Sequence, residues 1–239
     1  MIGREVYIVD CCLPIDTMRE LAAEAHELYW YDHHAGSTAI AAELGWGCID
    51  ERECGATLTW RQLYPDEPLP ELLAYVRDKD LWQWRLPDGR AIVAALESRL
   101  DDDNLDQFWE WSREELLAEG QPLLAEQQRQ ARRIVRRGVR SQDAYGRMGR
   151  TAWVMNTGEL INESADLACQ PLDAGGQGAD LAVCFHLRPD GRWLHSLRST
   201  KVDCRRIAED RNGGGHSQAA AYIATVPFPL ADDCLDWPD

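Results

Sequence analysis

Residues 5–34, EVYIVDCCLPIDTMRELAAEAHELYWYDHH, decide the fold of the first part of the chain. Apolar and aromatic runs predict strands over 4–10 and 28–31. Between them, a helix that begins at Pro14 and extends to about Ala25 carries apolar residues at helical spacing. Two short strands joined by a helix predict a βαβ unit, in which the strands are parallel and belong to an α/β sheet.

Each of these strands ends in residues that can bind a metal ion. Asp10 closes the first strand, and Asp32, His33 and His34 follow the second. The carboxyl ends of parallel strands meet at one edge of the sheet, which is where open α/β sheets bind ligands. Carboxylate and imidazole ligands suit Mn²⁺ and, less well, Fe²⁺, Co²⁺ or Mg²⁺. The sequence therefore predicts a metal site suited to phosphate chemistry.

A second motif, Gly213-Gly214-Gly215-His216, lies near the other end of the chain. Three successive glycines let backbone N–H groups point into a concavity that an anion can fill. We expect a helix over 216–223, whose N-terminus adds positive partial charge. Upstream, Arg198 and Ser199 follow an expected strand over 192–198. A glycine run alone is typical of a flexible turn, whereas a strand ending in arginine, a helix and this loop form a more specific pattern.

The two motifs together resemble the DHH phosphoesterase superfamily. Its metal-binding domain carries Asp-His-His, and its smaller associated domain carries Gly-Gly-Gly-His. The resemblance covers nearly the whole chain. It implies an α/β protein with a parallel-sheet DHH domain over 1–120, a long connector helix over 121–140 and a smaller α/β substrate-binding domain over 141–239.

The resemblance also implies a role for each matching residue of the first domain. Asp10 matches the aspartate that bridges two metal ions, and His33 matches a metal-ligating histidine. His34 matches the histidine that faces the substrate phosphate, and Asp32 matches the acid that orients a histidine from behind. The family's fourth motif is an aspartate just past a helix, which Asp78 fits best as a metal ligand. Asp80 is the alternative.

In the second domain, the matching residues are implied to bind substrate. Arg198 would hold a phosphate, and Ser199 would donate a hydrogen bond to it. The backbone of Gly213, Gly214 and Gly215 and the side chain of His216 would bind the scissile phosphate or its neighbour. Asn212 stands where members commonly have glycine, and asparagine tolerates the left-handed backbone that this position would need.

The family's first motif, a strand followed by a histidine and two aspartates, has no counterpart in the sequence. Asp10, His33 and Asp78 would then complete at most one of the family's two metal positions. Either a start further upstream precedes this sequence, or the chain is a degenerate member that keeps a nucleotide-binding surface. Because the other motifs are intact, we favour the first explanation.

The composition limits the classes of function. The 239 residues include 41 acidic and 25 basic ones, a net charge of −16, which argues against a general nucleic-acid coat protein. A polyanionic substrate would be attracted by metal or by a local positive patch. Eight cysteines without regular spacing indicate reduced thiols and a cytoplasmic location. No segment has the pattern of a signal peptide or a membrane span, so we expect neither secretion nor membrane insertion.

Arginines recur along the connector helix, which we expect to begin near Pro122. Their spacing of three, one, three, one and three residues places them along one face. This set either guides a short nucleic acid or pairs with the acidic first domain, and the sequence leaves both open. We call it the arginine stripe, and it consists of Arg129, Arg132, Arg133, Arg136, Arg137 and Arg140.

Beyond the connector, the pattern alternates between strand and helix, as expected for a second α/β domain. The tail after Pro227 is rich in proline and aspartate, and we expect it to be irregular. The expected strands lie at about 142–147, 151–155, 180–187 and 192–198, and the expected helices near 160–169, 203–209 and 216–223.

Taken with the resemblance, these features imply a hydrolase. The implied reaction is cleavage of phosphodiester bonds in short oligoribonucleotides or (cyclic) dinucleotides by a metal-activated hydroxide. The implied partner is such an RNA or nucleotide substrate, with no membrane, and a homodimer stays open. The alternative is a truncated or degenerate member that binds a nucleotide or short RNA without hydrolysing it.

Overall fold

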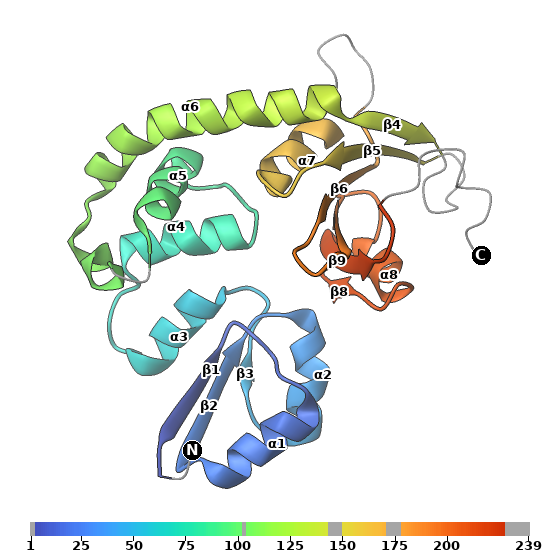
Figure 1. The fold of residues 1–239 in the computed structure, drawn as a ribbon. Coiled ribbons are helices and arrows are strands. Elements are labelled where there is room, and N and C mark those ends of the chain that lie inside the picture. The colour runs from blue at the N-terminus through green and yellow to red at the C-terminus, as the bar shows by residue number, and fades with distance from the viewer. Residues whose placement is uncertain (1–2, 102–103, 143–149, 171–177, 228–239) are drawn as a thin grey trace. The chain divides into compact units, whose positions relative to one another are not determined.

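The computed structural model describes residues 3–101, 104–142, 150–170 and 178–227 (Figure 1). The chain divides into two compact units, Met1–Leu124 and Ala125–Asp239, and each is described by itself. Both units combine a β-sheet with helices, so the α/β class predicted from the sequence is confirmed.

The first unit begins with the predicted βαβ arrangement. Its strands form a three-stranded parallel sheet in the order β1-β2-β3, with Glu5 of β1 opposite Glu27 of β2. Five further helical segments follow the sheet, the last of which continues into the second unit. The elements are β1 (Glu5–Val9), α1 (Ile15–Glu24), β2 (Glu27–Asp32), α2 (Ala35–Leu44), β3 (Cys48–Ile49), α3 (Gly55–Leu63), α4 (Glu71–Asp80), α5 (Gly89–Arg99), the 3₁₀ helix η1 (Leu105–Glu110) and α6 (Arg113–Arg137).

The alternation of side chains along the strands assigns each face of the sheet to different helices. Ile8 and Trp30 are buried with Met18 in a cluster that includes apolar residues of α1 and α2 (Figure 1). Val9 points to the opposite face, where it lines a pocket with Ala56 and other residues of α3. The sheet is therefore covered on both sides, and its carboxyl edge stays accessible at Asp10.

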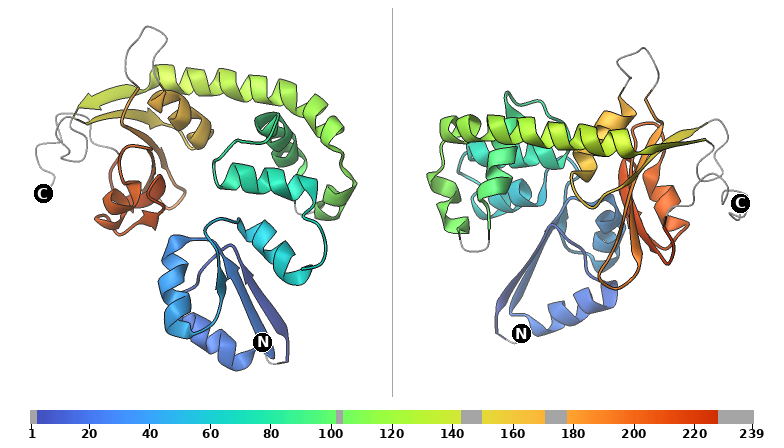
Figure 2. Two further views of the ribbon diagram at one scale, coloured as in Figure 1. Left: turned by 180° about the vertical axis from the view of Figure 1, so that it is seen from behind. Right: turned by 45° about the horizontal axis from the view of Figure 1, so that its top comes forward.

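The second unit contains a mixed six-stranded sheet in the order β4-β5-β6-β7-β9-β8 (Figure 2). Its β5 and β6 are parallel and joined across α7, while the remaining pairs are antiparallel. The core gathers around Val183, Leu197, Ile207 and Tyr222. The elements after α6 are β4 (Val139–Gln142), β5 (Thr151–Asn156), α7 (Ile161–Cys169), β6 (Leu181–Leu187), β7 (Trp193–Arg198), α8 (Cys204–Glu209), β8 (Gly214–Gly215) and β9 (Ala219–Ala224).

The prediction of a helix over 216–223 is wrong. Residues 219–224 form β9, which pairs with β7 on one side and with β8 on the other. Alanine favours a helix locally, but hydrogen bonding to two neighbouring strands overrides that preference. The small side chains also allow close packing, since a Cβ on Gly213 would lie 2.2 Å from the carbonyl oxygen of Ala221.

Other expected elements are confirmed with shifted ends or cannot be compared. The connector helix is part of α6, which begins at Arg113 rather than near Pro122, so Pro122 lies inside the helix. The strand expected at 142–147 falls mostly on 143–149, outside the described residues, as does the tail beyond 227. Among the described residues, no helix combines the length and apolar character needed to cross a bilayer.

A buried histidine makes the second unit sensitive to acid. His195 on β7 is 1% exposed, and its ring stacks on Tyr222 with centroids 4.6 Å apart. Neither ring nitrogen has a hydrogen-bond partner within the described structure. Burial lowers the pKa of His195 to about 4, because protonation would leave a charge without solvation in the core.

Replacing His195 with phenylalanine should reduce the loss of stability in acid. The folded pKa is below the unfolded one, so the neutral ring contributes stability above about pH 6.5, and this is lost as the pH falls toward 4. The difference of about 2.5 pKa units corresponds to about 3 kcal/mol. Urea unfolding at pH 7 and pH 4.5 measures it. The exposed His26→Phe is the control, and an unchanged acid sensitivity in His195→Phe would contradict the prediction.

Candidate metal centre

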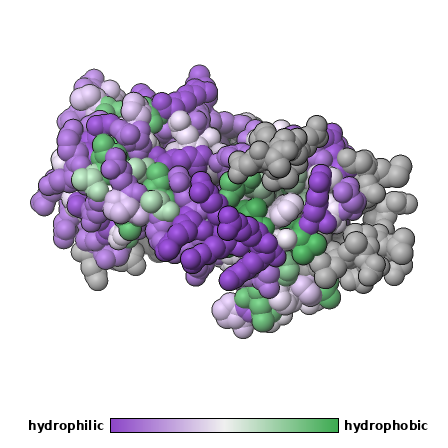
Figure 3. Space-filling view, turned by 90° about the horizontal axis from the view of Figure 1, so that it is seen from above, coloured by the Kyte–Doolittle hydropathy of each residue, from purple (hydrophilic) through white to green (hydrophobic). Residues whose placement is uncertain are grey.

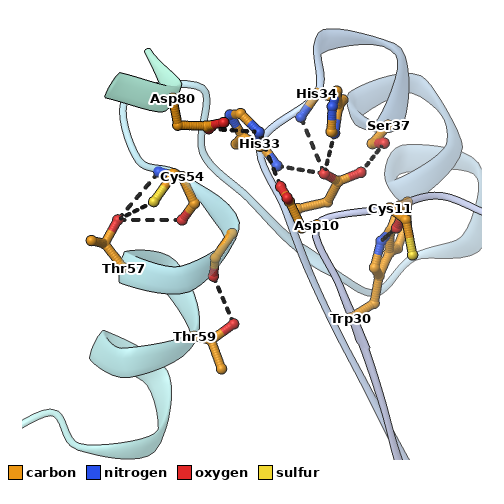
Figure 4. A network of polar contacts seen from close by, with 12 residues as sticks. Asp10, Cys11, Trp30, His33, His34, Ser37, Cys54, Thr57, Thr59 and Asp80 are labelled. Carbon is orange, nitrogen blue, oxygen red and sulfur yellow. Dashed lines mark hydrogen bonds and ion pairs between the residues drawn. The ribbon is translucent and has the colours of Figure 1, made fainter. Parts of the chain in front are cut away.

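Asp10 follows the last residue of β1 in a left-handed conformation, with φ of 60°. Its backbone N–H donates to the carbonyl oxygen of Tyr31 at 2.9 Å, which continues the contact between β1 and β2. This turn directs the carboxylate toward His33, whose Nε2 lies 3.1 Å from Oδ1 of Asp10 (Figure 4). The positive φ of a non-glycine residue here is backbone strain of the kind that accumulates at functional sites.

Gly55, the first residue of α3, packs directly on Asp10. A Cβ on Gly55 would lie 2.4 Å from Cβ of Asp10 and 2.7 Å from its Oδ1. Only glycine therefore allows the helix to begin at this distance from the carboxylate.

Asp32 organises the two histidines from inside the protein. The residue is fully buried, and its Oδ1 accepts hydrogen bonds from the backbone N–H of His33 at 2.7 Å and from Nδ1 of His34 at 2.6 Å. Its Oδ2 accepts from the hydroxyl of Ser37 at 2.5 Å. Burial opposes the charge of Asp32, but these hydrogen bonds outweigh burial and lower its pKa. The carboxylate thus stays ionised and fixes the ring of His34.

His33 is buried and faces two carboxylates. Its Nε2 lies 3.1 Å from Asp10 and 3.3 Å from Oδ2 of Asp80 (Figure 4). The hydrogen bond with Asp10 is the main cause of a raised pKa of His33; burial acts against it and the charge of Asp80 adds to it. A metal bound at Nε2 must displace this proton, so metal affinity should fall at low pH.

Ligand atoms from three residues converge at this sheet edge. One such atom each from Asp10, His33 and His34 lies within 4.8 Å of the others, close enough to hold one metal ion. The rings of His33 and His34 are 4.5 Å apart. The donors are oxygen and nitrogen only, which fits Mn²⁺, Fe²⁺, Co²⁺ or Mg²⁺. Within the described residues, this is the one group of at least three such side chains.

The structure does not bring Asp78 to the cluster. Asp78 is buried, and its two oxygens accept the backbone N–H groups of Arg85 at 2.9 Å and Leu86 at 3.0 Å. It therefore fixes the turn between α4 and α5. Asp80, the last residue of α4 and the alternative for the fourth motif, contacts His33 instead. Of the two aspartates considered for the fourth motif, it is therefore Asp80 and not Asp78 that lies beside His33.

In the second unit, Arg198 lies at the end of β7, opposite Ala219 of β9. Its Nε donates to Oδ1 of Asn162 at 2.7 Å, and another nitrogen donates to the carbonyl oxygen of Leu197. Burial lowers the pKa of Arg198. No carboxylate forms an ion pair with it among the described residues, so its charge is available to an anion.

Ser199 is used differently from what the sequence led us to expect. Its buried hydroxyl donates to the carbonyl oxygen of Asp180 at 2.6 Å and accepts the backbone N–H groups of Lys201 and Val202. These contacts close the turn after β7. Because the hydroxyl already donates its one proton, Ser199 is not a hydrogen-bond donor to substrate in this structure.

The glycine loop is an edge strand rather than the start of a helix. Gly214 and Gly215 form β8 beside β9, and the backbone N–H of His216 donates to the carbonyl oxygen of Ala219 at 2.7 Å. Asn212 has φ of 58°, so the expected left-handed backbone is confirmed there. With the helix absent, the expected contribution from a helix N-terminus is wrong. Any anion contact must come from the loop and from Arg198.

A cavity of about 890 Å³ opens beside α3 in the first unit. The largely buried carboxylate of Glu53 forms ion pairs with Arg61 at 3.2 Å and with Arg77 at 3.3 Å. The cavity adjoins the candidate metal centre through residues 53–55, since Gly55 touches Asp10. Its lining mixes both signs of charge: Arg52 pairs with Asp50, and Arg61 and Arg77 pair with Glu53, so the cavity is not a positive patch.

Two supporting residues were missed at the level of sequence. Ser37 is one turn beyond His34 in α2, and its signal is a hydroxyl near the start of a helix that follows the Asp-His-His string. Gly55 is a glycine at the first position of a helix. Glycine makes a helix less stable, so its presence there suggests that another residue packs too closely to leave room for a side chain. Neither signal identifies a supporting residue from the sequence alone.

No family model matches the chain. It is 24% identical over 249 aligned positions to the uncharacterized protein R106 of Acanthamoeba polyphaga mimivirus, which covers 97% of this chain and 57% of that protein. The chain thus spans little more than half the length of this curated relative.

Solved structures similar to the chain include two with a named activity. A pGpG-specific phosphodiesterase from Vibrio cholerae has a TM-score of 0.46 and 12% identity, covering 94% of each chain. An exopolyphosphatase-related protein from Bacteroides fragilis has a TM-score of 0.49 and 14% identity, covering 97% of this chain and 68% of that one. An uncharacterized protein from Helicobacter pylori has a TM-score of 0.34 and 14% identity, covering 99% and 81%.

Proposed function

We propose that the chain is a metal-dependent phosphoesterase of the DHH type that hydrolyses phosphodiester bonds of short oligoribonucleotides or (cyclic) dinucleotides. The observation that carries the proposal is the convergence of Asp10, His33 and His34 at the carboxyl edge of a parallel sheet. Mn²⁺ is the proposed metal, because the ligands are carboxylate and imidazole.

The metal would be held by Asp10 and His33, with Asp80 as a further oxygen ligand. Asp80 supports this role because it already contacts the ring nitrogen of His33 that would bind the ion. When bound, the metal would supply Lewis acidity and an activated water for attack on phosphorus. Gly55 at the start of α3 packs against Asp10 and holds this carboxylate at the site.

His34 would hold the substrate phosphate or a proton next to the metal. Its Nδ1 is held by Asp32, which fixes the orientation of the ring beside the metal position. In the second unit, Arg198 and His216 would bind substrate phosphate, together with the backbone of Gly213, Gly214 and Gly215. Arg198 supports this role because its half-buried guanidinium hydrogen-bonds to Asn162 and to the backbone, and no described carboxylate lies at ion-pair distance from it.

The direct test is Mn²⁺-dependent hydrolysis of a short 5′-labelled oligoribonucleotide by the full chain. We expect release of mononucleotide, and we expect Asp10→Ala to lose at least about 100-fold in rate, because a ligand is removed from the metal. Asp16→Ala is the matched control, since the side chain of Asp16 is 86% exposed, lies on α1 and is not part of the cluster. Equal activity of parent and Asp10→Ala would contradict the proposal.

A second candidate is a nucleotide-binding or RNA-binding member that does not hydrolyse its ligand. It is favoured by the ligand count, because the described residues contain one group able to hold one ion, whereas two-metal hydrolysis needs ligands for a pair. Binding of the oligoribonucleotide without turnover in Mn²⁺ would select this candidate.

A further inference from the structure

Five arginines of the stripe lie on the solvent-exposed side of α6, whereas Arg140 lies beyond the end of the helix, on β4, and not on the connector helix where we expected it. The helix packs on the sheet of the second unit through Ala131, Ile134 and Val135, with Trp153 donating a hydrogen bond to the carbonyl oxygen of Val135. Positions one residue away from this apolar face carry the arginines, and all six side chains of the stripe are exposed. Figure 3, viewed from the side of α6, shows a band of strongly hydrophilic side chains.

Within the second unit, few carboxylates pair with the stripe. Arg129 pairs with Glu126, three residues before it. Among the described residues of this unit, no carboxylate forms an ion pair with the other five arginines. Pairs such as Arg132 with Arg136 and Arg133 with Arg137 place like charges one turn apart, which destabilises a helix.

The helix dipole explains only part of this arrangement. Cations near the C-terminus of a helix are favourable, but the effect is confined to the last turn. Arg136 and Arg137 lie there, whereas Arg129, Arg132 and Arg133 lie earlier in α6, which ends at Arg137. The helix dipole therefore does not explain the arginines that lie up to two turns before the C-terminal end of the helix.

We propose that the arginine stripe binds the phosphate backbone of a single-stranded nucleic acid. All six residues are arginine, whose planar guanidinium binds phosphate through two hydrogen bonds. From Arg129 to Arg137 the helix rises about 12 Å, so the stripe is long enough to contact more than one phosphate along a single strand.

Two other partners fit this surface less well. A membrane-binding helix needs a free apolar face, but the apolar residues of this part of α6 are packed in the core of the second unit. A protein interface is usually centred on apolar or aromatic residues, and the exposed face from 129 to 137 offers charged and polar side chains. The phosphate backbone is recognised by charge and needs no such centre.

The test is binding of a fluorescein-labelled 20-nucleotide oligouridylate, measured by fluorescence anisotropy in EDTA at several salt concentrations. EDTA prevents metal-dependent hydrolysis, so the result does not depend on the proposed catalytic activity. The stripe variant changes four arginines to glutamine: Arg132, Arg133, Arg136 and Arg137. The control variant makes the same change of net charge elsewhere, at Arg4, Arg19, Arg150 and Arg192.

We expect the stripe variant to bind at least about tenfold more weakly, and its slope of log affinity against log salt to fall by about 3, since each phosphate contact contributes about 0.7 on a single strand. Replacing the same four arginines with lysine should retain most of the slope. Circular dichroism checks that each variant is folded.

Three results would overturn the proposal. The stripe variant and the parent could bind the oligouridylate equally, the control variant could lose as much affinity as the stripe variant, or the parent could prefer polyglutamate over the oligonucleotide. The last result would identify an acidic protein as the partner.

Discussion

Asp32→Asn should weaken Mn²⁺ binding by about 10- to 100-fold, although Asp32 itself does not touch the metal position. The buried carboxylate accepts the Nδ1–H of His34, the backbone N–H of His33 and the hydroxyl of Ser37. An amide has one acceptor oxygen in place of two and carries no charge. It would leave one of these donors without an acceptor and release the ring of His34.

The same substitution should lower the free energy of unfolding by about 3 kcal/mol, because buried donors lose a charged acceptor. Isothermal titration with Mn²⁺ and urea unfolding measure the two effects. Asp16→Asn, at an exposed position of α1, makes the same change of charge and should change neither. Ser37→Ala removes one hydrogen bond only and should have a smaller effect than Asp32→Asn. A variant Asp32→Asn with the Mn²⁺ affinity of the parent would show that Asp32 does not position the ligands.

Gly55→Ala is the second substitution for which we expect a large effect. The added methyl group would lie 2.4 Å from Cβ of Asp10, so either α3 or Asp10 must move. Overpacking of this kind typically costs about 1–3 kcal/mol. Moving the Asp10 carboxylate away from His33 would also separate the two ligands, and we expect Mn²⁺ affinity to fall at least about tenfold.

Gly36→Ala is the matched control for Gly55→Ala. Gly36 lies in the first turn of α2, and a Cβ there would meet nothing within 4 Å. Because alanine favours a helix more than glycine does, this control should be neutral or slightly stabilising. If Gly55→Ala retained both the stability and the Mn²⁺ affinity of the parent, the close packing of α3 on Asp10 would have no part in the site.

Local periodicity was sufficient to predict the first part of the fold. The strand before Asp10, the helix after Pro14 and the strand before Asp32 are each determined by their own residues, and the parallel pairing follows from the helix between them. The convergence of Asp10, His33 and His34 is a consequence of that topology, because both strands end at the same edge.

Features that depend on distant pairing could not be predicted in this way. The alanines of β9 favour a helix by themselves, and only hydrogen bonds to β7 and β8 make them a strand. Asp78 and Asp80 lie within one turn of the same helix end. Which of them faces His33 depends on the turn over 84–86, whose N–H groups bind Asp78. Ser199 was assigned to substrate from its neighbour Arg198, whereas its hydroxyl closes a turn.

The most direct test of the metal centre is a titration of the full chain with Mn²⁺, followed by electron paramagnetic resonance, in which the signal of free Mn²⁺ decreases on binding. We predict saturable binding that weakens at least about tenfold in Asp10→Ala and is unchanged in Asp16→Ala. If the chain bound no Mn²⁺, or if Asp10→Ala bound it as tightly as the parent, the sheet edge at Asp10 and His33 would not be a metal site.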